Sequence, residues 1–245
     1  MLDLSQTPIY LDNHATTRVD PRVVQAMLPF FDVHFGNAHS LIHRSGEAAR
    51  DAVATARTRI AAMLEVSADE IVFTSGATES NNLALRGIAE HPHNDRRRIV
   101  TAVTEHPAVL DPLSRLERRG FEIVRIGVSP AGCADAGLID LERLENAVDE
   151  RTALVSVMAA NNEIGVLQPL DEIGRIARRH GAAFHSDATQ ALGKIPLSPR
   201  RLGIDLVSFT AHKLHGPKGV GGLYVREGSP RLRLEPQLAG GGHEA

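Results

Sequence analysis

Apolar residues recur along this chain at two spacings, one typical of helices and one typical of buried strands. Between residues 49 and 64 they recur at helical spacing with charged residues between them, which predicts an amphipathic helix. Residues 153–159 are almost entirely apolar, as in a strand that is buried on both faces of a sheet. The same patterns predict further strands at residues 71–74, 98–104, 121–128, 183–186, 206–210 and 222–226. They predict further helices at residues 78–89, 108–119, 140–147 and 170–180.

Strands that alternate with helices in this way are typical of an α/β fold. We therefore predict a mostly parallel central sheet with helices on both faces. In such sheets ligands bind beyond the carboxyl ends of the strands. Polar segments follow five of the predicted strands, at residues 75–78, 105–106, 161–163, 187–190 and 212–213. The sequence thus predicts a functional site at that edge of the sheet.

The composition narrows the class of protein. The chain has 245 residues, of which 42% are hydrophobic and 23% are charged, so neither a disordered nor a fibrous protein is indicated. Its net charge of −3 provides no basic surface for nucleic acid. No apolar run approaches the roughly 18 residues that span a bilayer, and the first residues lack the pattern of a signal peptide. We expect a soluble cytoplasmic protein with no nucleic-acid or membrane partner.

Few residues suit a metal or disulfide site. Cys133 is the only cysteine, which excludes a disulfide within the chain and any site that needs several thiolates. His91 and His93 form an HxH pair, but they lie in a polar segment, where a solvated turn is the favoured interpretation. No metal site is predicted.

Three of the polar strand ends have both a chemical and a simpler interpretation. Gly76 permits a tight turn, and the N–H groups that open the next helix, with the Thr78 hydroxyl, would suit a phosphate group; an ordinary capped turn is the alternative. Asp187 could hold a protonated ring nitrogen, orient a histidine, bind a metal or cap a helix. His106 could stack on a ring or lie near the surface with its hydrogen bonds satisfied.

Lys213 points to a more specific chemistry. It follows an apolar strand and precedes a glycine-rich run at residues 216–222. A lysine at the buried mouth of a parallel sheet is unusual unless its amine has a chemical task. With a lowered pKa, such an amine forms a Schiff base with a carbonyl group. Combined with a phosphate cradle and an acid for a ring nitrogen, Lys213 predicts pyridoxal 5'-phosphate as the cofactor.

Six segments resemble, in the same order, motifs of the cysteine desulfurases, the NifS/IscS-like members of the class V aminotransferases. They are LDNHATT at 11–17, SGATESNN at 75–82, TEHPAV at 104–109, NNEIG at 161–165, HSDATQ at 185–190 and AHKLHGPKG at 211–219. The resemblance runs from about Ile9 to Glu244, and the closing GGGHE at 240–244 is similar to the IscS-like branch. It implies the large domain of a fold-type-I transferase that depends on pyridoxal 5'-phosphate.

The resemblance also implies residue roles. Lys213 would carry the cofactor and then act as the base at the substrate α-carbon, and His106 would stack on the ring and help proton transfer. Asp187 would keep the ring nitrogen protonated. Gln190 would hydrogen-bond the phenolic oxygen, and Asn162 would lie near that oxygen and the substrate carboxylate. The phosphate would be held by Ala77, Thr78, Thr210 and His212, and family members often have Ser at the position of Thr210.

An enzyme of this family removes sulfur from L-cysteine and leaves L-alanine and an enzyme persulfide, which supplies iron–sulfur cluster assembly and other thio-cofactors. The resemblance implies a homodimer and sulfur-acceptor scaffold proteins as partners. Residues 1–15 would pack with a small domain, and residues 16–245 would form the large domain. We expect the chain to be truncated, without that small domain and its loop bearing the nucleophilic cysteine. Cys133 lies in a variable loop and is not expected to replace that cysteine.

Three interpretations stay open on the sequence. The chain is the large-domain portion of a cysteine desulfurase, another class V aminotransferase or lyase, or an inactive remnant that dimerises with a partner. The closeness of the IscS-like motifs disfavours the second. Without a small domain, the segment at residues 9–17 would leave apolar surface uncovered, so we expect self-association or dependence on a partner.

Overall fold

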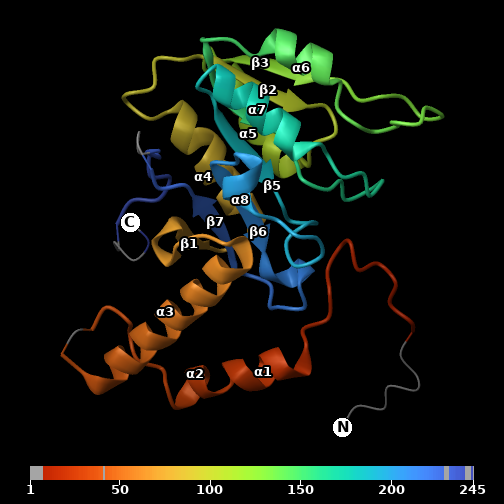
Figure 1. Ribbon diagram of the computed structural model, residues 1–245. Coiled ribbons are helices and arrows are strands. Elements are labelled where there is room, and N and C mark those ends of the chain that lie inside the picture. The colour runs from red at the N-terminus through yellow and green to blue at the C-terminus, as the bar shows by residue number, and fades with distance from the viewer. Residues whose placement is uncertain (1–7, 41, 229–231, 241–243, 245) are drawn as a thin grey trace.

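A seven-stranded sheet lies at the centre of the protein, in the order β1-β7-β6-β5-β4-β2-β3 (Figure 1). The computed structural model describes residues 8–40, 42–228, 232–240 and 244. The strands are β1 (Ile71–Thr74), β2 (Arg98–Ala102), β3 (Glu122–Ile126), β4 (Thr152–Ser156), β5 (Ala183–Asp187), β6 (Leu206–Thr210) and β7 (Gly221–Val225). The α/β fold that the sequence predicted is confirmed.

The helices alternate with these strands along the chain. The longer ones are α3 (Arg44–Leu64), α4 (Ala77–Ala89), α5 (Pro107–Glu117), α6 (Leu141–Ala147) and α7 (Leu170–Arg179). The short ones are α1 (Pro21–Met27), α2 (Pro29–Asp32), α8 (Pro199–Leu202) and the 3-10 turns η2 (Ala68–Glu70) and η3 (Ala211–Lys213).

Strand direction brings the carboxyl ends of most strands to one edge. The pairs β2–β3, β2–β4, β4–β5 and β5–β6 are parallel, whereas β7 is antiparallel to both β6 and β1. The connection from β6 to β7 covers only residues 211–220, and a parallel crossover needs a dozen or more residues. Because β7 reverses direction between them, β1 runs the same way as β6, and its carboxyl end lies at the same edge.

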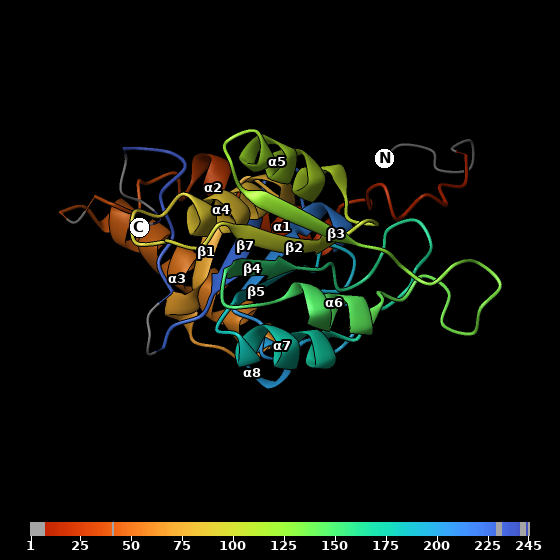
Figure 2. The same cartoon turned by 90° about the horizontal axis from the view of Figure 1, so that it is seen from above.

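The core consists of two apolar layers, one on each face of the sheet. Successive strand residues point to opposite faces. Leu154 and Leu206 pack with apolar residues of α4 and α5, whereas Val155 and Val207 pack with those of α6 and α7. Figure 2 shows α4 and α5 on one side of the sheet and α6, α7 and α8 on the other. This two-sided burial is the physical reason for the continuous apolar run at residues 153–159.

Two features of the helices differ from the sequence prediction. The helices α1, α2 and α8 were not predicted, because segments of four to seven residues are too short to display a helical period. The helix α3 exists, but it begins at Arg44, and its buried residues are Gly46, Ala49, Ala61 and Leu64. Much of its predicted apolar face is therefore exposed.

Some predicted features lie at the margins of the described chain. Residues 1–7 of the predicted N-terminal segment, and Gly241, Gly242 and His243 of the closing motif, lie outside the described residues. Residues 8–15 are described and are exposed. None of the helices in the described ranges has the length and apolar character needed to cross a membrane.

Candidate functional site

A pocket of about 810 Å³ opens at the edge where the parallel strands end. It is lined by segments that follow five different strands, as the pattern of polar residues predicted. All the residues predicted to bind a cofactor contribute to this lining, namely Ala77, Thr78, His106, Asn162, Asp187, Gln190, Thr210, His212 and Lys213. Segments that are far apart in sequence thus meet in one cavity.

The start of α4 forms one wall of the pocket. Gly76 precedes the helix with φ of 151°, a conformation that favours glycine. A Cβ on Gly221 of β7 would lie 2.7 Å from the Gly76 Cα atom, so the two backbones touch. The Ser80 hydroxyl donates a hydrogen bond of 2.9 Å to the Gly222 carbonyl oxygen and holds α4 against β7. The first N–H groups of α4, at Ala77 and beyond, have no partner within the helix and suit an anion.

Asp187 ends β5 and is 4% exposed. One carboxylate oxygen accepts a hydrogen bond of 2.7 Å from the Asn81 amide, and the other accepts one of 2.9 Å from the Thr189 N–H. Sequence reasoning did not assign this role to Asn81. A signal was available, because Asn81 lies four residues after Ala77 and therefore on the same face of α4.

Lys213 lies in η3, directly after β6. Its Nζ atom donates a hydrogen bond to the carbonyl oxygen of His14. Burial, followed by the nearby charge of Lys194, lowers the pKa of the Lys213 amine. The Gln190 amide also binds the His14 carbonyl, at 2.9 Å, and its oxygen accepts a hydrogen bond of 2.7 Å from Lys194. A lysine with a lowered pKa is more often uncharged, as a nucleophile requires.

His106 and Asn162 lie at two other strand ends. His106 is the N-cap of α5, where its Nδ1 atom accepts a hydrogen bond of 3.0 Å from the Ala108 N–H. This bond fixes the orientation of the imidazole ring, and the capping role at α5 was not predicted from the sequence. The Asn162 amide donates a hydrogen bond of 2.7 Å to Glu163.

Thr210 and His212 complete the wall beside Lys213. Thr210 is 3% exposed, and its hydroxyl lies 3.4 Å from the Val220 carbonyl oxygen that accepts its hydrogen bond. The Nδ1 atom of His212 lies 3.1 Å from the Thr16 hydroxyl. Burial, with the charges of Lys213 and Lys218, lowers the pKa of His212.

Glu105 is a buried carboxyl group next to the site. Its Oε1 atom accepts a hydrogen bond of 2.8 Å from the N–H of Met158, a residue that lines the pocket. Its Oε2 atom has no hydrogen-bond partner among the described residues. Burial raises the pKa of Glu105 well above its usual value, with the charge of Asp187 acting in the same direction. The folded protein therefore holds this proton more tightly than an exposed glutamate does.

The other candidates from the sequence lie elsewhere. Cys133 is exposed and does not line the pocket. His91 and His93 are bridged by a hydrogen bond of 3.2 Å from the His93 N–H to the His91 ring, consistent with a turn. The described residues contain no group of three or more His, Cys, Asp or Glu side chains placed to hold a metal ion.

Comparison with known proteins gives consistent matches over nearly the whole chain. Residues 9–245 match the Aminotransferase class-V family. The cysteine desulfurase IscS of Rickettsia felis (strain ATCC VR-1525 / URRWXCal2) is 52% identical over 237 residues, which are 97% of this chain and 56% of the relative. The IscS of Rickettsia massiliae (strain Mtu5) is 51% identical with the same coverage. The chain thus spans about half the length of the curated relatives it matches.

Solved structures match in the same way. A NifS-like protein superposes with a TM-score of 0.90 at 43% identity, over 97% of this chain and 63% of that protein. SspA, solved in complex with cysteine, superposes with a TM-score of 0.89 at 37% identity, over 97% of this chain and 66% of SspA. DndA from Streptomyces lividans superposes with a TM-score of 0.81 at 42% identity, over 96% of this chain and 65% of DndA.

Proposed function

The chain belongs to the class-V aminotransferase family, and from this membership we propose that it carries the cofactor site of a cysteine desulfurase that uses pyridoxal 5'-phosphate. The observation that carries the proposal is the convergence of Lys213, Asp187 and His106 with the start of α4 on one pocket. A reactive amine, an acid, a flat ring and an anion cradle are the four groups that this cofactor needs.

Two further side chains fit a polar ligand in this pocket. Asn81 and Thr189 both line it, and each has a buried oxygen with no hydrogen-bond partner among the described residues. Buried polar atoms in folded proteins are nearly always hydrogen-bonded. A ligand with several polar groups would supply the missing partners.

Bound pyridoxal 5'-phosphate supplies an electron sink for negative charge at the substrate α-carbon. Lys213 would hold this group through its amine and act as the base, because burial lowers the pKa of that amine. Asp187 would keep a proton on the ring nitrogen, since two N–H donors hold its carboxylate in place. His106 would lie against the ring and assist proton transfer. Gln190 would hydrogen-bond the phenolic oxygen, and Asn162 would lie near that oxygen and the substrate carboxylate. Ala77, Thr78, Thr210 and His212 would bind the phosphate.

Sulfur transfer requires a thiolate that attacks the sulfur of the substrate L-cysteine. A sulfur–sulfur bond forms, the carbon–sulfur bond breaks, and its electron pair with a proton stays on carbon to give L-alanine. Cys133 is exposed and outside the pocket, so it is not the proposed thiolate. The proposal also includes a homodimer, a sulfur-acceptor protein as partner and a cytoplasmic location. Residues 16–245 would form the large domain, and residues 1–15 would pack with a small domain.

Absorption spectroscopy tests the cofactor site directly. We expect the purified chain to stay yellow after pyridoxal 5'-phosphate is added and unbound cofactor is removed, because a covalent bond to a lysine amine retains the cofactor and moves its absorption to longer wavelength. The Lys213→Ala substitution should abolish this band. The matched control is Lys218→Ala, which removes another lysine of the same pocket and should leave the band in place.

Other outcomes of this test would contradict the proposed site or favour another class of reaction. A chain that stays colourless, or a band that survives Lys213→Ala, would contradict the proposed site. Product analysis after addition of L-cysteine distinguishes the reaction classes, because transfer of the amino group would give a keto acid in place of L-alanine. A keto acid as the product would favour the aminotransferase alternative.

A further inference from the structure

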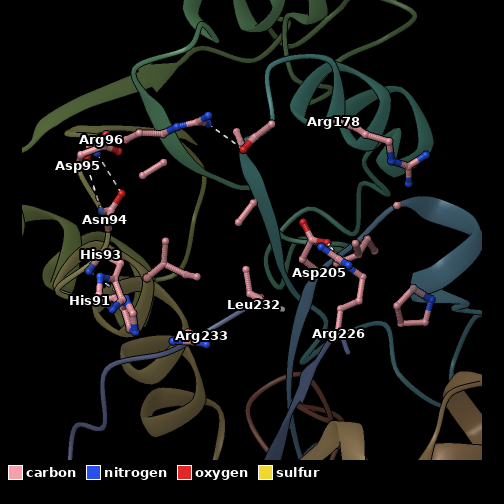
Figure 3. Close-up of a pocket in the computed structure, with 18 of the residues that line it drawn as sticks. His91, His93, Asn94, Asp95, Arg96, Arg178, Asp205, Arg226, Leu232 and Arg233 are labelled. Carbon is pink, nitrogen blue, oxygen red and sulfur yellow. Dashed lines mark hydrogen bonds and ion pairs between the residues drawn. The ribbon is translucent and has the colours of Figure 1, made fainter. Parts of the chain in front are cut away.

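A second pocket, of about 660 Å³, opens at the opposite edge of the sheet from the candidate functional site (Figure 3). Ala153 and Ala183 line it near the amino ends of β4 and β5, and Asp205 lines it directly before β6. Among the described residues, none lines both pockets. A ligand in this pocket would therefore leave the proposed cofactor site free.

Five arginine side chains line this second pocket, and three of them already have partners. Arg226 forms an ion pair with Asp205, and Arg200 forms one of 2.8 Å with the buried carboxylate of Glu70. Arg96 donates hydrogen bonds to three backbone carbonyl oxygens at 2.7–3.1 Å. These contacts stabilise the pocket walls and leave those guanidinium groups less available for a ligand.

Arg178 and Arg233 are the other two, and neither has a hydrogen bond or ion pair to any part of the chain that the structure describes. Figure 3 shows Arg178 on α7 and Arg233 on the segment that follows β7, on different sides of the pocket. The Arg178 guanidinium fits here because residue 203 is glycine. A Cβ at Gly203 would lie 2.4 Å from the Arg178 Nη2 atom.

The charge and polarity of the lining define a ligand class. Against the five arginines stand Asp95 and Asp205 of the lining and Glu70, which pairs with Arg200, so an excess of two positive charges is left. Ile88, Leu232 and several alanines supply apolar surface between the arginines. Guanidinium groups bind phosphate oxygens through paired, charge-assisted hydrogen bonds, and apolar surface binds the uncharged body of an organic molecule.

We propose that this pocket binds a small organic phosphate, with Arg178 and Arg233 as the two guanidinium groups whose charge attracts it. The size of the pocket suits a small molecule. A phosphate monoester carries close to two negative charges at neutral pH and so compensates more of the positive excess than a single carboxylate does.

Isothermal titration tests this proposal with the purified chain loaded with pyridoxal 5'-phosphate and then freed of unbound cofactor, so that the proposed cofactor site is filled and no free organic phosphate competes for the second pocket. The probes are adenosine 5'-monophosphate, adenosine and inorganic phosphate, at low salt and up to millimolar concentrations. We expect adenosine 5'-monophosphate to bind more tightly than either of the others. The Arg178→Gln and Arg233→Gln substitutions should each weaken its binding about tenfold.

Arg175→Gln is the matched control, because Arg175 is an exposed arginine of the same helix that does not line the pocket. It should leave the affinity unchanged. All three arginines are exposed, so the variants are expected to fold, and a thermal melt checks this. Absence of heat with both phosphate-bearing probes would overturn the proposal. Equal affinity for adenosine, equal affinity for inorganic phosphate, or an equal effect of Arg175→Gln would overturn it too.

Discussion

Glu105 and Asp187 are carboxyl groups with opposite surroundings. Asp187 receives two N–H hydrogen bonds, one on each carboxylate oxygen. Glu105 receives one, from Met158, and its second oxygen has no partner among the described residues. Burial then dominates and raises the pKa of Glu105. The nearby charge of Asp187 acts in the same direction.

The raised pKa of Glu105 predicts how stability depends on pH. The folded protein binds this proton more tightly than the unfolded chain, whose glutamate has a pKa near 4.5. The contribution of Glu105 to the free energy of unfolding therefore falls as pH rises above about 4.5. Glu105→Gln keeps an acceptor for Met158 and cannot ionise, so urea unfolding should show a smaller loss of stability between acidic and neutral pH.

Glu117→Gln is the control for this measurement. Glu117 is exposed, and its hydrogen bond with Arg125 lowers its pKa, so its ionisation favours the folded state. Replacing Glu117 should leave the decline that Glu105 causes in place. An identical pH profile for the wild type and Glu105→Gln would show that Glu105 is ionised in the folded protein.

Much of the site could be predicted residue by residue, because its members directly follow strands whose apolar pattern is clear. Lys213 after β6 and Asp187 at the end of β5 are examples. The partners of these residues could not be predicted. The contact between Asn81 and Asp187 depends on how α4 crosses β5, and the contact between Lys213 and His14 joins segments almost a whole chain apart. The pattern of apolar and polar residues within a segment does not indicate which distant segment it contacts.

At the scale of elements, the sequence predicted the bounds of the strands better than the direction in which each strand runs. β1 and β6 have the predicted bounds, because short apolar runs end sharply at polar residues. The antiparallel course of β7 has no signal in its own residues and follows from the short connection to β6. Only the structure explains why β7 begins with glycine, because Gly221 touches the Gly76 backbone at the start of α4.

Gly221→Ala tests this close approach. The new Cβ would lie 2.5 Å from the Phe209 carbonyl oxygen and 2.7 Å from the Gly76 Cα, and backbone atoms cannot move away cheaply. We expect the free energy of unfolding to fall by about 1–3 kcal/mol, the usual cost of overpacking. The affinity for pyridoxal 5'-phosphate should also fall, because the start of α4 is displaced.

Gly127→Ala provides the comparison, since a Cβ at Gly127 would meet nothing within 4 Å. It should change neither stability nor cofactor affinity by a measurable amount. Chemical denaturation and the cofactor's visible absorption report the two quantities separately. If Gly221→Ala behaved like Gly127→Ala, the two backbones would have room to separate.

At the scale of the whole molecule, apolar exposure is concentrated near the N-terminus. Phe31 and Phe35 are 72% and 74% exposed, and Ile9 and Leu11 are 87% and 82% exposed. The helices α1 and α2 have no buried residues among those described, and Figure 1 shows them away from the sheet. An apolar surface of this kind is typical of a region that contacts another polypeptide.

Exposed apolar surface in water favours association, because each buried Å² contributes roughly 25 cal/mol. We therefore expect the isolated chain to self-associate as its concentration rises, measured by sedimentation velocity at several concentrations. The double substitution Phe31→Ser and Phe35→Ser should shift association to higher concentration. Leu238→Ser is the control, since Leu238 is 75% exposed but lies outside the N-terminal region. A wild-type chain that stays monomeric at every concentration would contradict this expectation, because apolar groups on α2 and beside it would then be stable in contact with water alone.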